Sequence, residues 1–466
     1  MTNLAHKQID AHATRALCMQ EWQKLSEKWL PVTEVGSIWR YSRSENLSDI
    51  KQGWKLHVAA TVLSAGQVLQ AVAPYLHRRD VMFKGPGSLD ELEKLNAGTE
   101  YSYSQIGKFL TVYPRSPHEA RSLLRELHRL TRGFAAPTIP FDRRYRQDSI
   151  VYYRYGSFET LYLEDSDGRR VPALHGPDGK LIPEARYAET ERPEWIPALL
   201  ANEVPAPVES SPLITNYRAF KSLTQRGKGG VYKAVDLTSS PPRFCILKEG
   251  RFCGETSWDA TDGASLVAHE EVVLRSLQTK GIPAPTVIAS FELQRNKYLV
   301  TEFFDGTTLD ELLRKRQRRL QFNRIVAYAI QLASLINRIH EAGWAWRDCK
   351  PANLILGRNG AMRPIDFEGA TPIDVVQHNV WGTANFTPDR SAGGSGRLSD
   401  LYALGAVIFF MIGGQLPAAE KPVSLKTLRP NTPKELCSFV HRLLNPGSIL
   451  SARQASQELH RFSYRL

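Results

Sequence analysis

The sequence contains few cysteines, and none of them are paired at metal-binding spacing. Five cysteines occur in 466 residues, and no two form a Cys-x-x-Cys motif. Because structural zinc sites and disulfide frameworks are built from clustered cysteines, this scatter argues against both. It predicts instead a protein of the reducing cytoplasm.

Long hydrophobic runs are also missing. A membrane-spanning helix needs about 20 predominantly apolar residues, and the most apolar stretch, 401–414, is shorter and predicts a buried helix. The first thirty residues carry Asp10, Glu21 and Glu27 and no uninterrupted apolar segment. A secretory signal is therefore not expected, and the sequence predicts a cytoplasmic protein without a membrane span.

Acidic residues are fewer than basic ones, and the formal net charge is +12. A basic surface suits nucleic acid, anionic lipid, or acidic and phosphorylated peptides, and charge alone does not choose among them. The basic run at 314–319 is interpreted as the exposed end of a helix, so no nucleic-acid partner is expected. A hydrophobic content of 42% indicates an ordinary globular protein.

The chain is too long for one ordinary core and divides at a proline-rich segment. Residues 202–212 are polar and without periodicity, which predicts a linker between domains at 1–201 and 213–466. The first half mixes helical patterns with strands such as 108–113 and 150–155, which predicts an α+β domain. The second half predicts a sheet-rich lobe at about 213–303 and a helical lobe at about 304–466, the layout of protein kinases.

The sheet-rich lobe offers candidates for binding a nucleotide. Three glycines lie between strand-like segments, where their amides could cover phosphates, although two of the three positions expected for loop glycines hold Thr224 and Arg226. Lys248 ends an apolar strand and would pair with phosphates. A following helix should supply a glutamate, for which Glu270 is preferred over Glu271. The loop glycines are Gly227, Gly229 and Gly230.

The strongest signal is the block Trp-Arg-Asp-Cys-Lys-Pro-Ala-Asn at 346–353, followed by Ile-Asp-Phe-Glu at 365–368. In phosphoryl transfer Asp348 would orient the acceptor hydroxyl and Lys350 would hold the γ-phosphate. Asn353 and Asp366 would hold Mg²⁺. The spacings between these residues are those of protein kinases and predict a Ser/Thr kinase that uses ATP or GTP.

Two positions depart from the kinase pattern. Trp346 stands where a histidine is usual, and Glu368 stands where the metal motif usually has glycine. Neither change removes a metal ligand or the catalytic aspartate, so we favour an active enzyme. A pseudokinase that binds nucleotide or peptide without turnover is the alternative.

Cations in the first half occur in apolar surroundings. Lys55 and His57 alternate in Trp-Lys-Leu-His, so on a strand they share one face while Leu56 faces the core. Burying an unpaired cation is costly, so cations gathered in this way indicate an anion such as phosphate. The other members of the set are Lys84, Lys108 and Arg154.

These residue types suit the elimination of phosphate from phosphoserine or phosphothreonine. A base must remove a weakly acidic α-proton, and an acid must protonate the departing oxygen. A lysine whose pKa is lowered by neighbouring cations can be the base, and a protonated histidine can be the acid.

The first half resembles the N-terminal lyase domain of class III lanthipeptide synthetases. The resembling pieces are WKLH at 54–57, FK at 83–84, GKFLTVYP at 107–114, FDR at 141–143 and YRYGSF at 153–158. The second half is similar to the kinase domain of the same enzymes, whose metal motif also tends to read Asp-Phe-Glu. The resemblance extends to phosphothreonine lyases, which use a similar Lys-x-His.

The resemblance implies roles for single residues in the first half. It makes Lys55 the general base and His57 the general acid, with Asp142 orienting one of the cations. It makes Arg143 and Arg144 further candidates for binding phosphate. The phosphate ligands that it implies are Lys84, Lys108 and Arg154.

The resemblance also implies a substrate and partners. The kinase would phosphorylate Ser or Thr of a ribosomally made precursor peptide with a leader segment, and the lyase would form dehydroalanine or dehydrobutyrine. Class III synthetases normally end in a cyclase domain, and no sequence remains for one after 466. We therefore expect dehydration without cyclisation, with a separate cyclase protein as a candidate partner. The alternatives are a kinase whose first half binds phosphopeptides, and a pseudokinase scaffold.

Overall fold

The computed structural model describes eleven segments of the chain and divides into two compact units. The first unit comprises Met1–Tyr232, Lys248–Ser265 and Glu292–Tyr298, and the second comprises the remainder. The predicted linker lies mostly outside the described residues, since 201–210 are not among them. The described residues are 10–43, 50–159, 161–184, 192–200, 211–315, 319–375, 381–388, 395–417, 423–445, 447–449 and 451–463.

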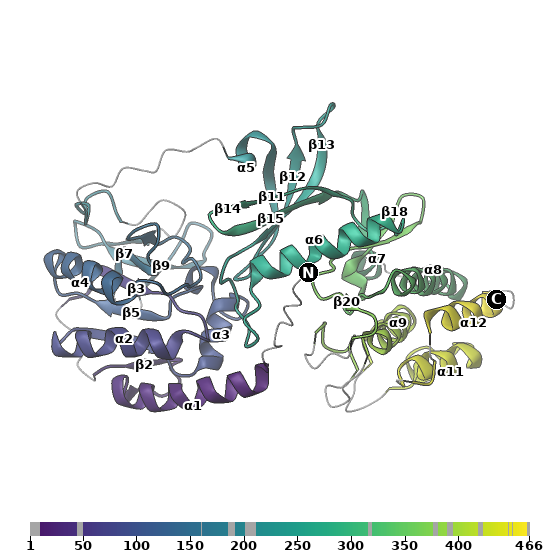
Figure 1. The fold of residues 1–466 in the computed structure, drawn as a ribbon, viewed down its shortest axis with the longest axis horizontal. Coiled ribbons are helices and arrows are strands. Elements are labelled where there is room, and N and C mark those ends of the chain that lie inside the picture. Colours follow the sequence, from purple (N-terminus) through teal and green to yellow (C-terminus); the bar gives the residue numbers. More distant parts are fainter. Residues whose placement is uncertain are drawn as a thin grey trace, which may run out of the picture. The chain divides into compact units, whose positions relative to one another are not determined.

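The first half is built on an antiparallel sheet of seven strands (Figure 1). Its order is β1-β2-β4-β5-β3-β7-β6, so β3 lies inside the sheet between β5 and β7. The strands are β1 (Val32–Thr33), β2 (Trp39–Tyr41), β3 (Gln52–Val58), β4 (Met82–Pro86), β5 (Leu110–Tyr113), β6 (Arg143–Arg144) and β7 (Val151–Ser157).

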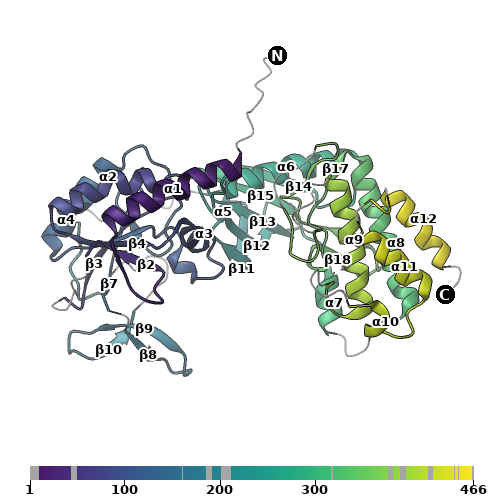
Figure 2. The same cartoon turned by 90° about the horizontal axis from the view of Figure 1, so that it is seen from below.

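Helices cover one face of this sheet, as Figure 2 shows for α1, α2 and α4. Serine hydroxyls cap the N-termini of α3 and α4: Ser88 accepts from the Glu91 amide and Ser116 from the Glu119 amide. The core between helices and sheet contains fully buried Leu56 of β3. The helices are α1 (Ala11–Trp29), α2 (Ala65–Arg78), α3 (Leu89–Ala97) and α4 (Pro117–Leu130).

A second, three-stranded sheet lies on the other side of the first sheet, away from α1, α2 and α4 (Figure 2). It consists of β8 (Tyr162–Glu164), β9 (Arg170–His175) and β10 (Leu181–Pro183). The turns between these strands contain Asp-Gly pairs at 167–168 and 178–179, in which Gly168 and Gly179 have φ angles of +74° and +78°. The small sheet therefore lies on the face of the large sheet that the helices do not contact.

The second half begins with a five-stranded sheet in the order β11-β12-β13-β15-β14. Part of it belongs to the first compact unit, where Trp258, from the segment after β13, packs in the core of the N-terminal half. The elements are α5 (Pro212–Thr215), β11 (Tyr217–Arg226), β12 (Gly229–Asp236), β13 (Arg243–Gly250), α6 (Gly263–Thr279), β14 (Val287–Leu293) and β15 (Asn296–Glu302).

The rest of the second half is mainly helical, as predicted. It contains β16 (Gly306–Thr308), α7 (Leu309–Lys315), α8 (Phe322–Glu341), β17 (Trp344–Ala345), β18 (Leu354–Gly357), β19 (Met362–Pro364), β20 (Thr371–Pro372), α9 (Gly396–Gly413), α10 (Leu425–Leu428), α11 (Lys434–Leu443) and α12 (Ala452–Ser463). Among the described residues only α9 is long and apolar enough to cross a membrane, and 72% of it is buried inside the structure. A core helix passes this test of length and composition as well, so α9 is weak evidence for a membrane span.

Candidate active sites

The sheet of the first half gathers the predicted cations on one face. In the antiparallel register Lys55 lies opposite Arg154, His57 lies opposite Thr111, and Thr111 lies opposite Lys84. Residues directly opposite each other in a sheet project from the same face, and Lys55 and His57 are two positions apart on β3. Lys55, His57, Lys84 and Arg154 therefore all project from the face of the sheet that the helices do not cover.

Asp142 connects two of the basic groups. Its Oδ2 lies 2.5 Å from His57 Nδ1, and its Oδ1 lies 3.2 Å from Lys108 Nζ. The carboxylate side chain is fully buried, and although burial raises its pKa, Lys108 and His57 hold that pKa well below its usual range. The ionised carboxylate of Asp142 accepts a hydrogen bond from the N–H at Nδ1 of His57. This bond orients the imidazole ring so that Nε2 is the nitrogen available to contact a substrate.

The pKa of Lys55 is lowered to about 7, chiefly by burial and further by Lys84, Arg154 and Lys108. Glu184 opposes this shift. The pKa of His57 is lowered to about 4, again chiefly by burial, and Asp142 opposes the shift. Near neutral pH the pair therefore carries at most one positive charge, and that charge resides mainly on Lys55.

The depressed pKa of Lys55 can be tested by chemical labelling. Acetylation of Lys55, followed by mass spectrometry across a pH series, is expected to reach half of its maximal rate near pH 7, because only the neutral amine reacts. Inorganic phosphate should move this midpoint upward, because an anion favours the charged lysine. A midpoint above about 9, as for an ordinary lysine, would contradict the assignment.

The other predicted basic residues have different surroundings. Burial lowers the pKa of Lys84 to about 8, and its Nζ lies 4.6 Å from the centre of the Trp39 ring. Arg144 Nη2 donates to Thr138 Oγ1 at 2.8 Å. Arg143 lies opposite Tyr153, one position away from Arg154, and so projects from the other face.

Glu184 is a member of this site that the sequence did not suggest. Its Oε1 accepts a hydrogen bond from Arg154 Nη2 at 2.9 Å, and both side chains are 4% exposed. A Cβ added at Gly156 would lie 2.6 Å from the same oxygen, so a larger residue there would displace the Glu184 carboxylate. A glycine inside a strand often marks a site where another group approaches the backbone closely. Gly156 in Tyr-Gly-Ser was the sequence signal that could have indicated such a group here.

The kinase-like motif forms a compact hydrogen-bonded loop. Lys350 Nζ lies 2.8 Å from Asp348 Oδ2 and 2.9 Å from Thr383 Oγ1. Asn353 Nδ2 donates to the carbonyl and to Oδ2 of Asp348, at 2.9 and 2.8 Å. Burial raises the pKa of Asp348, against the effect of Lys350. The structure thus brings together three residues that the sequence motif predicted.

Trp346 takes part in this loop in spite of its unusual side chain. Its indole N–H donates to the Asp366 carbonyl at 2.8 Å, and its ring stacks on Phe367 with centroids 5.5 Å apart. Asp400 of α9 anchors the same loop, accepting from the amides of Trp346 and Arg347 at 2.8 and 2.7 Å. The substitution at 346 therefore preserves a donor toward the metal motif.

Three carboxylates meet beside this loop. Oxygen atoms of Glu270, Asp366 and Glu368 all lie within 4.8 Å of one another. Glu270 is buried and also accepts from the Phe367 amide at 3.0 Å. Glu271 instead accepts from Arg275 and Ser290. A set of hard oxygen donors suits Mg²⁺, so the residues fit the expected metal, with Glu368 added to the predicted ligand Asp366.

The predicted nucleotide loop has one amide already engaged. Gly227 N–H donates to the Ala97 carbonyl at 2.8 Å, within the first compact unit. A Cβ at Gly227 would lie 1.6 Å from the Asn96 carbonyl oxygen, so glycine is required for this approach. Gly229 and Gly230 begin β12, and Lys248 lies half-buried on β13.

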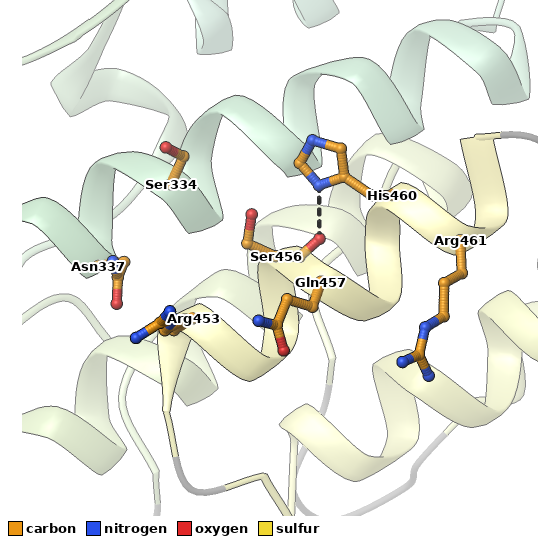
Figure 3. Close-up of a pocket in the computed structure, with 7 residues that line it drawn as sticks. All are labelled: Ser334, Asn337, Arg453, Ser456, Gln457, His460 and Arg461. Atoms are coloured by element: carbon orange, nitrogen blue, oxygen red, sulfur yellow. Dashed lines mark hydrogen bonds between the residues drawn. The ribbon is translucent and has the colours of Figure 1, made fainter.

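A polar groove elsewhere in the second unit contains none of the predicted residues. It has a volume of about 520 Å³ and lies between α8 and α12 (Figure 3). His460 at its rim is satisfied within its own helix, where its Nδ1 lies 2.8 Å from the Ser456 carbonyl. It is lined by Ser334, Asn337, Arg453, Ser456, Gln457, His460 and Arg461.

Comparison with known proteins accounts for both halves. Residues 20–224 match the family of the RamC N-terminal domain, and residues 226–448 match the protein kinase domain family. The chain is a RamC N-terminal domain joined to a protein kinase domain. The expected fold, a mixed helix-and-strand domain followed by a two-lobed kinase domain, is thereby confirmed.

Individual proteins are also similar to the whole chain or to its kinase domain. The chain is 30% identical to the probable SapB synthase of Streptomyces coelicolor, over 76% of this chain and 39% of that protein. The kinase domain is 27% identical to serine/threonine-protein kinase F of a Synechocystis species, over 44% of this chain and 45% of that protein. The chain thus spans less than half the length of either relative. The resemblance to class III lanthipeptide synthetases is confirmed for the RamC N-terminal and kinase domains.

Proposed function

We propose that this protein dehydrates Ser and Thr residues of a ribosomally made peptide in two steps. The kinase domain phosphorylates the hydroxyl with Mg-nucleotide, and the RamC N-terminal domain eliminates the phosphate to give dehydroalanine or dehydrobutyrine. The observation that carries this proposal is the cluster of Lys55, His57, Lys84 and Arg154 on one sheet face, backed by Asp142. A phosphate dianion is the anion that such a cluster suits.

In the elimination step the Lys55 amine removes the α-proton of the phosphorylated residue. The electron pair of that C–H bond forms the new C=C bond, the Cβ–O bond breaks, and phosphate leaves with a proton from His57 Nε2. The reactive form therefore has Lys55 neutral and His57 protonated, which near neutral pH is the less populated of the two arrangements of the single positive charge. Lys84, Lys108 and Arg154 neutralise charge on the phosphate and on the developing enolate.

In the phosphorylation step Asp348 accepts a hydrogen bond from the substrate hydroxyl and directs it toward the nucleotide. Lys350, held 2.8 Å from Asp348, is placed to neutralise charge on the transferred phosphoryl group. Asn353 and Asp366 would hold Mg²⁺, with Glu368 near Asp366 as a further candidate ligand. The ion when bound neutralises phosphate charge.

Asp142 is a positioning residue in this proposal, and Asp142→Asn is expected to slow elimination by about 10² to 10³-fold. The carboxylate raises the pKa of His57 against the effect of burial and so stabilises the protonated imidazole that the elimination needs, which the neutral amide cannot do. Elimination rates on a synthetic phosphopeptide over a pH series would measure this. Phosphorylation by the same variant should be unchanged, and equal elimination rates at every pH would contradict the role.

The decisive test is the intact mass of a candidate precursor peptide after incubation with Mg-ATP. Loss of whole waters supports both activities together. Gain of phosphate alone would retain the kinase and overturn the lyase, leaving a kinase whose RamC N-terminal domain binds phosphopeptides. Nucleotide binding without any change in peptide mass, for a peptide shown to bind, would favour the pseudokinase alternative.

A further inference from the structure

A cavity of about 300 Å³ lies within the first compact unit, beside the cluster of basic residues. Its walls come from β7 of the large sheet, from β9 and the end of β10 in the small sheet, and from the segment 192–195. The lining residues used below are Arg154, Leu174, Ile182, Glu184, Arg192, Glu194 and Trp195.

The cavity adjoins the proposed base through two shared residues. Arg154 lies directly opposite Lys55 in the sheet, and it also lines the cavity. Glu184 lines the cavity as well, and it accepts a hydrogen bond from Arg154. A peptide whose phosphorylated residue lay at Lys55 would therefore have its neighbouring residue at the mouth of this cavity.

One buried donor in the cavity wall lacks an acceptor among the described residues. Arg154 Nε is buried and makes no hydrogen bond, although Nη2 is bonded to Glu184. Arg154 as a whole is 4% exposed. Because a buried N–H without a partner is costly, this atom indicates that an acceptor arrives with a ligand, and a peptide carbonyl supplies one.

The remaining wall is apolar and partly open. Leu174 is buried, and Trp195 beside the cavity is 42% exposed, so part of its ring is open to a ligand. Two carboxylates, Glu184 and Glu194, and two guanidinium groups, Arg154 and Arg192, also face this space, so its charges balance. An aliphatic or aromatic ligand side chain would cover Trp195 and Ile182, whereas a small or polar one would leave them uncovered.

We propose that this cavity is the subsite for the residue next to the phosphorylated Ser or Thr, and that it selects an apolar side chain. The inference rests on the proposed lyase function. Arg154 Nε–H donates to a carbonyl of the peptide, and the adjacent side chain packs between Ile182, Leu174 and Trp195.

The test compares synthetic phosphoserine peptides that carry leucine, glycine or aspartate on both sides of the phosphoserine. The wild-type protein is expected to eliminate phosphate from the leucine peptide with a kcat/KM about tenfold above those for glycine and aspartate, which leave the apolar wall uncovered. Ile182→Ala and Trp195→Ala should remove most of the leucine preference through KM, with kcat retained.

Leu181→Ala is the matched control for Ile182→Ala. The two residues are neighbours on β10, but only Ile182 lines the cavity, and Leu181 is 42% exposed. Equal loss of preference in Leu181→Ala and Ile182→Ala would overturn the proposal, as would a wild-type protein that does not distinguish leucine from glycine. Absence of elimination from every peptide would overturn the proposed lyase function itself, a result distinct from elimination without preference.

Discussion

Lys55→Met is expected to abolish elimination while leaving phosphorylation intact. The variant keeps the length of the half-buried side chain but has no amine to remove the α-proton. Loss of a general base typically costs about 10² to 10⁴-fold in rate, and we expect the upper part of this range because the described site offers no second neutral amine at the same position. With Mg-nucleotide, the precursor peptide should gain phosphate groups that accumulate.

The measurement for Lys55→Met is the ratio of phosphorylated to dehydrated peptide by intact mass, together with elimination from a pre-phosphorylated peptide. Lys51→Met is the control, because Lys51 lies exposed just before β3. That variant should dehydrate the peptide like the wild type. Normal dehydration by Lys55→Met would show that another group is the base.

Asp348→Asn is expected to have the opposite phenotype. The amide retains the shape of the side chain but can no longer accept the proton of the substrate hydroxyl, and it weakens the contact to Lys350. We expect phosphorylation to fall about 10³-fold. Elimination from a pre-phosphorylated peptide should proceed at the wild-type rate, since the basic cluster of the RamC N-terminal domain is untouched.

The control for Asp348→Asn is Asp305→Asn in the same unit. Asp305 forms an ion pair with Arg358 in which both side chains are largely exposed, so its loss should matter little. Phosphorylation by Asp348→Asn at near wild-type rates would contradict the assignment. Loss of elimination in this variant would show instead that the two activities are not separable.

Short-range patterns in the sequence predicted a large part of both sites. Asp348, Lys350 and Asn353 lie within six consecutive residues, so their spacing alone brings them together once the loop forms. Lys55 and His57 share a face because side chains alternate along any strand. Such relations depend on local backbone geometry, which the sequence determines directly.

Glu270 and Glu271 show the limit of local reasoning. Both glutamates stand at the middle of α6, one residue apart, and the helical pattern only favoured Glu270. Packing distinguishes them: Glu270 is buried beside Asp366 and Glu368, whereas Glu271 bonds Arg275 on its own helix. Burial of a side chain depends on which elements pack against the helix, and the sequence of the helix alone does not determine those contacts.

The sequence by itself determined that a kinase motif and a Lys-x-His strand exist, because both are set by residue type and local spacing. Only the tertiary structure placed Asp142 against His57, 85 residues away in the chain, and Glu184 against Arg154. Strand register placed Arg154 opposite Lys55. Pairings between distant segments follow from the packing of the whole sheet, since many registers satisfy the same local preferences and only one buries the entire apolar face.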